Sequence, residues 1–163
     1  MQEHRIDLGL VEGICRLPNL RYTTFLQDEL VAVVHTGSKL SLPDEITPED
    51  LSRIPLVLRE RGSGTLDVFE RALSEHNMKL SSLNVLLYLG STESIKLFLE
   101  HTDCIGIVSI RSISRELLSG TFRVIEIKGM PMLREFCFAQ PQGQESGLSQ
   151  VLMQFAMHHN KKL

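Results

Sequence analysis

The chain has few cysteines, no long apolar run and no cluster of basic residues, and each absence excludes a class of protein. Its three cysteines, Cys15, Cys104 and Cys137, lie far apart with no metal-binding spacing, so neither a disulfide framework nor a zinc site is expected. No segment approaches the ~18 consecutive apolar residues of a membrane span. The first residues, MQEHRIDLGLVEG, lack the features of a secretion signal. We therefore expect a reduced, cytoplasmic protein.

The overall composition is that of a folded chain. The 163 residues include 17 basic and 20 acidic side chains, giving a net charge of −3, and 42% of the residues are apolar. These values predict one soluble globular domain or two small lobes. A slightly acidic chain without a basic run is not expected to bind nucleic acid by itself.

Strand-like runs alternate with helix-like stretches, which predicts an α/β fold with mostly parallel strands. A strand begins the chain and a strand and helix end it, with strand–helix units between, so the order suggests one lobe interrupted by an inserted second lobe. The expected strands cover residues 6–13, 29–37, 54–60, 83–90, 104–110, 122–128 and 132–141. The expected helices cover 65–78, 94–101, 114–120 and 148–159, with a further helix start at 47–51.

Two strand–turn–helix connections carry glycines and hydroxyl side chains, GSGT at 62–65 and GSTES at 90–94. Free amides at a helix N-terminus attract anions, and both turns would lie at the carboxyl ends of strands, where open α/β sheets bind ligands. The alternative is that these serines and threonines only cap helices. Neither turn is a P-loop or a dinucleotide fingerprint.

Two charged positions are also candidates. Glu12 ends the first strand, and Arg59 either counters an anionic ligand or pairs with the adjacent Glu60. The six histidines are scattered, and no nucleophile elbow or carboxylate pair is present. We therefore expect no catalytic residues, no metal, no cofactor and no enzymatic activity.

Six segments occur along the chain in a characteristic order: IDLGLVEG, DELVAVVHTGSKL, ITPEDLSRIPLVLRERGSGT, LGSTESIKLFLEH, CIGIVS and MLREF. In these ordered motifs the chain resembles the effector-binding (substrate-binding) domain of LysR-type transcriptional regulators. The resemblance implies a type 2 periplasmic-binding-protein fold, in which two α/β lobes are joined by two crossover strands around a ligand cleft. On this chain it implies a first lobe at 1–29 plus 134–163 and an inserted second lobe at 30–133.

The same resemblance suggests which residues bind the effector. Leu66 stands where the family often has arginine, which weakens the case for charge recognition there. The implied effector-binding residues are Ser63, Gly64 and Thr65 in the second lobe, Glu12 and Gly13 in the first, and, as a weaker transfer, Ser91 and Thr92.

The resemblance implies a ligand-sensing regulatory domain that binds a small anionic or polar metabolite and modulates DNA binding by a longer protein. Because the family's helix-turn-helix and first strand–helix units have no counterpart in this sequence, we expect an incomplete first lobe. We also expect DNA contact only through the absent domain, and a homodimer or higher association through exposed edges. The alternative is a solute-binding protein of a transport system; an enzyme on the same fold ranks third.

Overall fold

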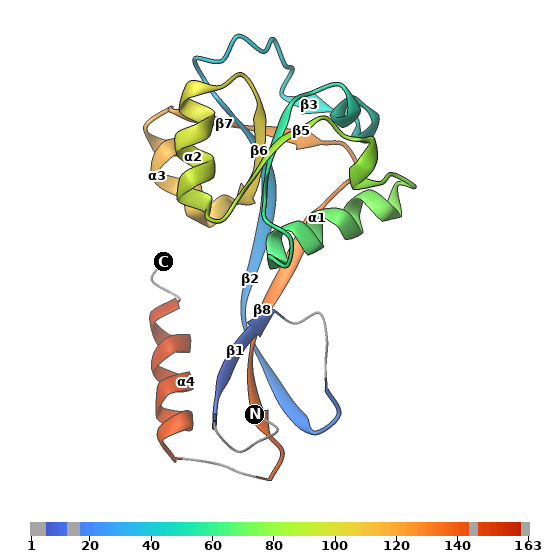
Figure 1. Cartoon of the computed structure of the whole chain (residues 1–163). Coiled ribbons are helices and arrows are strands. Elements are labelled where there is room, and N and C mark those ends of the chain that lie inside the picture. The colour runs from blue at the N-terminus through green and yellow to red at the C-terminus, as the bar shows by residue number, and fades with distance from the viewer. Residues whose placement is uncertain (1–5, 13–16, 144–146, 161–163) are drawn as a thin grey trace. The chain divides into compact units, whose positions relative to one another are not determined.

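The computed structural model describes residues 6–12, 17–143 and 147–160. The chain divides into two compact units (Figure 1). Unit 1 comprises residues 1–28 and 134–163, and unit 2 comprises residues 29–133. Strands β2 (Leu20–His35) and β8 (Met132–Pro141) each run from one unit into the other. In sequence, unit 2 is therefore an insertion in unit 1.

The sheet of unit 2 contains strands in both directions. β4 (Leu56–Arg59) pairs in parallel with β5 (Val85–Leu89) and with β6 (Ile105–Ser109). β2 lies on the other side of β6 and pairs antiparallel with it and with β7 (Phe122–Ile127). β7 also pairs in parallel with the short β3 (Glu45–Ile46).

The prediction of mostly parallel strands holds for unit 2, with β2 as the exception. The helical connections do make β4, β5, β6 and β7 run in one direction, as expected of βαβ units. However, β2 runs the opposite way between β6 and β7, and so creates two antiparallel pairings. The strand is also longer than predicted, since it begins at Leu20 rather than at residue 29.

Helices cover both faces of this sheet, and the alternation of side chains along β4 divides the core into two clusters. Leu56 and Leu58 pack with helix α1 (Gly64–Glu75), whereas Val57 packs with α2 (Thr92–His101) on the other face. Figure 1 shows α1 and α2 on opposite sides of the strands. Because β4 is buried on both faces, its buried residues form an unbroken apolar run in the sequence. The remaining helical segments of unit 2 are α3 (Ser114–Leu118) and the 3-10 helices η1 (Pro48–Ser52), η2 (Leu80–Ser82) and η3 (Ile110–Ile113).

The helix predicted at 65–78 corresponds to α1, which buries one apolar face. Leu66, Phe69 and Leu73 are buried in one cluster, and Met78 packs against the same cluster from beyond the helix end. The predicted helix start at Thr47 is also confirmed, although the helix that follows is a 3-10 helix. Cys104 and Cys137 are buried free thiols.

Unit 1 is built on the other ends of the two shared strands. β1 (Gly9–Glu12) pairs antiparallel with β8, Glu12 lying opposite Phe136, and β8 lies between β1 and β2. Phe25 of β2 contacts Phe138 of β8, with ring centroids 4.8 Å apart. The last helix is α4 (Gly147–Asn160). In the described part of the chain, no helix is long and apolar enough to cross a membrane.

Candidate functional site

The two predicted turns lie next to each other at one edge of unit 2. Arg59, the last residue of β4, is opposite Leu89, the last residue of β5, in a parallel register. Each strand leads directly into the N-terminus of a helix, α1 after β4 and α2 after β5. The Glu60 amide also donates to the carbonyl of Leu89 (3.1 Å), which joins the starts of the two turns. The carboxyl edge of these strands thus presents two neighbouring helix N-termini.

Ser63 is the N-cap of α1. Its hydroxyl oxygen accepts a hydrogen bond from the amide of Leu66 at 3.2 Å, and its side chain is buried. Gly62 has φ +86°, a left-handed conformation that favours glycine and allows the sharp turn from strand to helix. Gly64 and Thr65 are the first two residues of the helix, and Thr65 is buried. The capping role predicted as the alternative is therefore present, and effector contact by these residues stays a prediction.

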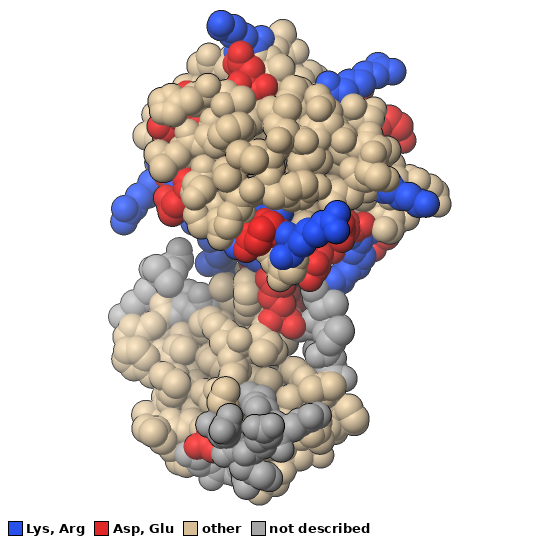
Figure 2. Space-filling model, in the orientation of Figure 1, with Lys and Arg blue, Asp and Glu red and all other residues tan. Residues whose placement is uncertain are grey.

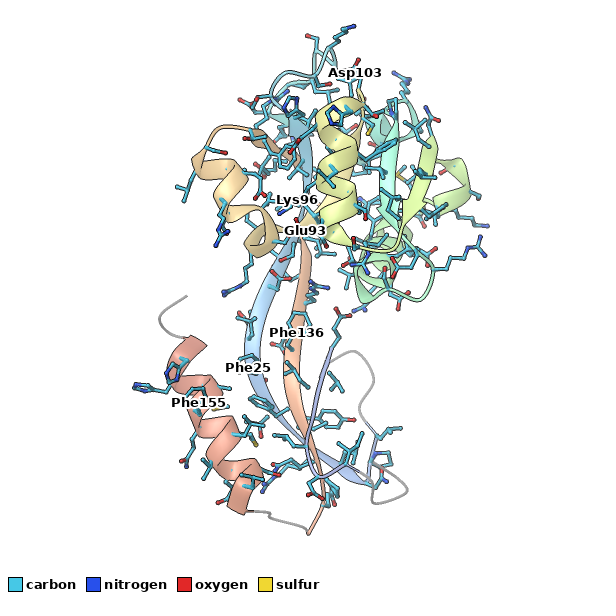
Figure 3. The ribbon with its side chains drawn as sticks, turned by 60° about the vertical axis from the view of Figure 1, so that its left-hand side comes forward. Phe25, Glu93, Lys96, Asp103, Phe136 and Phe155 are labelled. Carbon is cyan, nitrogen blue, oxygen red and sulfur yellow. The ribbon has the colours of Figure 1, made fainter. Side chains whose placement is uncertain are left out.

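Ser91 caps α2 in the same way. Its hydroxyl oxygen accepts from the amide of Ser94 at 3.1 Å, and the two hydroxyl groups lie 2.8 Å apart. Thr92 is the first residue of the helix. Glu93 does not remain at the helix end as an unpaired charge, because Lys96 forms an ion pair with it at 2.9 Å (Figure 3).

The structure distinguishes between the two predicted roles of Arg59, which were to counter an anionic ligand or to pair with Glu60. The guanidinium makes two contacts with the Glu60 carboxylate, from Nε at 2.8 Å and from Nη2 at 2.9 Å. These hydrogen bonds raise the pKa of Arg59 and lower the pKa of Glu60. The positive charge of Arg59 is thus paired with Glu60 inside the turn and is not available to pair with a ligand anion.

Serine at the end of β6 is a candidate that the sequence analysis missed. Ser109 is the last residue of β6, and its hydroxyl accepts from the amide of Arg111 at 3.2 Å to cap η3. Because β6 is parallel to β4, Ser109 lies at the same edge as Ser63 and Ser91. The signal was a serine directly after the buried run CIGIV, the same pattern of strand followed by hydroxyl that identified the other two turns.

In unit 1, Glu12 is part of a charged group. Its Oε1 atom lies 2.6 Å from Nη1 of Arg134, and the same guanidinium contacts Asp28. Asp28 and Arg134 did not appear among the predicted residues. Gly13, the other residue predicted for this strand tip, lies outside the described residues.

Unit 2 also contains a cavity of about 460 Å³, away from all predicted site residues. Its lining comes mainly from β2, β7 and the start of β8, and is mainly apolar. Its lining includes Glu29, Ala32, Ile125, Glu126 and Met132.

In the described part of the chain, no group of three or more metal-binding side chains is placed to hold an ion. Burial raises the pKa of the Cys104 thiol to about 11.

The model of the LysR substrate binding domain family matches residues 1–161. This chain belongs to that family. The HTH-type transcriptional regulator YeiE of Escherichia coli K12 is 33% identical over 125 residues, which are 77% of this chain and 41% of YeiE. The HTH-type transcriptional activator CmpR of Synechocystis is 29% identical over 144 residues, 88% of this chain and 46% of CmpR. The chain therefore spans less than half the length of these relatives.

Solved structures agree with the family assignment. The regulatory domain of Synechocystis CcmR, determined with 2-PG, has a TM-score of 0.82 and 25% identity, covering 100% of this chain and 77% of that one. The effector-binding domain of QuiR, determined with shikimate, has a TM-score of 0.77 at 19% identity and covers 99% of this chain and 75% of that one. The type 2 periplasmic-binding-protein-like fold is thus confirmed. The chain is a ligand-sensing regulatory domain, and not the solute-binding protein of a transport system.

Proposed function

We propose that this domain binds a small anionic or polar metabolite and thereby modulates DNA binding by a longer LysR-type transcription factor. The observation that carries the proposal is the pairing of two capped helix N-termini at adjacent strand ends, at Ser63 and Ser91. The partial positive charge of a helix N-terminus favours a nearby anion. The ligands bound to CcmR and QuiR, 2-PG and shikimate, are small acids of this class.

Contacts with the effector are proposed for both units. In unit 2 they come from Ser63, Gly64 and Thr65, with Ser91 and Thr92 contributing less. In unit 1 they come from Glu12, the last residue of β1, and from Gly13, which follows it in the sequence. We propose no catalytic role for any of them; the hydroxyls of Ser63 and Ser91 act as helix caps.

The partners follow from the proposed role. DNA is contacted through a helix-turn-helix domain of the longer protein and not through this domain, whose net charge is −3. The protein acts in the cytoplasm, where its DNA target lies. We propose that the domain associates as a homodimer or larger assembly, supported by the exposed apolar side chains Leu148, Val151, Leu152 and Phe155 of α4.

The effector site is tested by ligand-dependent thermal stabilisation of the wild type, Ser63→Ala and Thr65→Ala. A ligand that binds the native state raises Tm by mass action. With 2-PG, shikimate, inorganic phosphate and sulfate as probes, we expect at least one probe to raise the Tm of the wild type, and both variants to lose most of that shift.

Because Ser63→Ala also removes a helix cap worth ~1 kcal/mol, its Tm without ligand is expected to fall. Thr47→Ala is the matched control, since Thr47 bonds Asp50 at the start of η1, away from the strand ends of the site. It should lower the Tm but keep the full ligand shift. An unchanged ligand shift in the Ser63 and Thr65 variants would remove these residues from the site.

A further inference from the structure

The cavity of unit 2 lies where β2 and β7 stop pairing with each other. The pairs between these two strands end at Ala32 and Ile125. Beyond that point β2 still pairs with β6 as far as Leu30, and β7 still pairs with β3 as far as Ile127. The cavity of about 460 Å³ is lined by both strands at this place and by the turn that leads from β7 into β8. It therefore occupies the space that opens as the two strands separate.

The walls of this cavity are apolar and belong to the core of unit 2. Ala32, Ile125 and Met132 line it and are each at most 3% exposed. Met130, in the turn between β7 and β8, lines it as well and is buried. Small-molecule pockets are typically ~300–1,000 Å³ in volume, mostly apolar, and carry a few polar groups. The volume and the walls of this cavity match that description.

The charged groups of the lining are all of one sign. Among the described lining residues, only Glu29 and Glu126 are charged, and none is basic. Both are exposed, in contrast to the walls, so the carboxylates lie on the solvent side of the cavity. Strand alternation places Glu29 on the same face of β2 as Val31, and Glu126 on the same face of β7 as Val124. Both valines pack in the cluster on the α2 side of the sheet, so the two carboxylates share that side.

Ion pairs elsewhere in unit 2 do not use these two carboxylates. The acidic partners of its ion pairs in the described part of the chain are Asp44, Glu45, Glu60, Glu93 and Glu116. The negative charge beside the cavity is therefore not neutralised by a described lysine or arginine. A cleft that combines charge of one sign with apolar walls concentrates ligands of the opposite sign.

We propose that this cavity is a second ligand site, which binds a small organic cation, an amine with an apolar body. The apolar body enters the cavity, where its burial contributes affinity, and the amino group stays beside Glu29 and Glu126. A neutral molecule of the same shape gains only the contact with the walls, and an anion is repelled by both carboxylates. The site goes beyond the proposed effector site, because it takes ligands of the opposite charge and does not use the turns at Ser63 and Ser91.

Three probes with the same hexyl chain separate the effect of charge from that of apolar contact: hexylamine, 1-hexanol and hexanoate. They are titrated at neutral pH into the full chain with isotope-labelled methionine methyl groups, which are observed by NMR. Met130 and Met132 line the cavity, whereas Met78 packs against the same core cluster without lining it. We expect hexylamine to shift the Met130 and Met132 signals to saturation and to leave the Met78 signal in place. Hexanol should bind about three- to tenfold more weakly, and hexanoate more weakly still.

Two charge-neutral variants test the carboxylates directly. Glu29→Gln and Glu126→Gln keep the size of the side chain, and replacement at exposed positions is not expected to unfold the chain. Each should weaken hexylamine binding by about two- to fivefold, the range of an exposed ion pair, and leave hexanol binding unchanged. Glu100→Gln is the matched control, because Glu100 is an exposed carboxylate of α2 that does not line the cavity. It should bind both probes as the wild type does.

The outcomes separate the site from its preference for a cation. A preference for hexylamine over hexanol that falls in both glutamine variants supports the proposal. Equal binding of hexylamine and hexanol, tighter binding of hexanoate, or hexylamine affinity that is unchanged in both variants overturns the assignment of a cation. Hexylamine that shifts neither Met130 nor Met132 overturns the site itself. The proposed function stands or fails separately, since it is tested with anions at Ser63 and Thr65.

Discussion

A single glycine fixes how closely α2 approaches the sheet. A Cβ atom built on Gly106, in the middle of β6, would lie 2.9 Å from Cγ2 of Ile95 and 3.1 Å from Cδ1 of Leu99. Both neighbours are fully buried side chains of α2, so neither can turn away without disturbing the core. Close packing of this kind makes even one added methyl group costly.

We therefore expect Gly106→Ala to lower the free energy of unfolding by about 1–3 kcal/mol, measured by chemical denaturation. Gly90→Ala is the control, because a Cβ at Gly90 meets no atom within 4 Å. It should change stability by less than about 0.5 kcal/mol. Equal stability of the two variants would mean that α2 can shift to accommodate the added methyl group.

Some site residues could be predicted from the sequence and others could not, for a physical reason. Ser63 and Ser91 were found because strand, turn and cap are contiguous in the chain, so local chemistry identifies them. Asp28 and Arg134 are 106 positions apart and meet only because β2 and β8 are neighbours in the sheet. No local pattern encodes such a contact.

At the scale of elements, α4 is unusual because two of its faces are apolar. Residues 147–160 contain no lysine, arginine, aspartate or glutamate. Ser149 is buried and Met153 and Ala156 are half-buried, so this face lies toward the rest of unit 1. On the view in Figure 2, charged side chains are spread over unit 2, whereas the described surface of unit 1 is mostly uncharged. The outer face of α4 carries Leu148, Val151, Leu152 and Phe155, which are 54–79% exposed and spaced i, i+3, i+4, i+7.

A contiguous apolar stripe on an exposed helix face often marks an interaction surface. We expect this outer face to mediate association between copies of the chain, so light scattering should give a mass above the 18.4 kDa of one chain. The double variant Leu152→Glu, Phe155→Glu should reduce the mass to that of a monomer. The control is Leu118→Glu on α3, which alters a still more exposed leucine of unit 2, 90% accessible. A monomeric wild type at every concentration would contradict the prediction.

The strands buried on both faces were among the elements predicted well. The runs at 54–60 and 104–110 correspond to β4 and β6, whose short apolar runs favour a buried strand. The first half of β2, from Leu20 to Asp28, escaped prediction because its buried and exposed positions do not alternate cleanly, so no apolar period marks it. The direction of β2 was also unpredictable, since pairing direction depends on where a strand enters the sheet.

At the scale of the whole molecule, the apolar core is unevenly divided. Both clusters of buried apolar side chains lie within residues 30–132, so they belong entirely to unit 2. In the described part of unit 1, the buried apolar side chains are Cys137, Phe138 and Ala139 of β8. A unit with its own complete core is expected to fold alone.

We predict that residues 29–133, expressed by themselves, unfold in one cooperative transition with native secondary structure, measured by circular dichroism during heating and in denaturant. Phe69→Ala in this fragment should lower its unfolding free energy by about 3–5 kcal/mol, because Phe69 is fully buried in the larger cluster. A fragment that melts gradually, or that does not respond to Phe69→Ala, would show that unit 2 needs unit 1 to fold.

The two strands shared by the units have an evolutionary consequence. Unit 2 begins on β2 and ends on β8, which are neighbours in the sheet, so its first and last residues leave by adjacent strands. A segment whose two ends lie on adjacent strands can be replaced as a whole. The rest of the chain then has to be interrupted at only one place, between those two strands. Recombination at Glu29 and Leu133 would therefore give relatives of this protein new turns at the ends of β4 and β5, while Asp28 and Arg134, which lie outside the exchanged segment, stay in place.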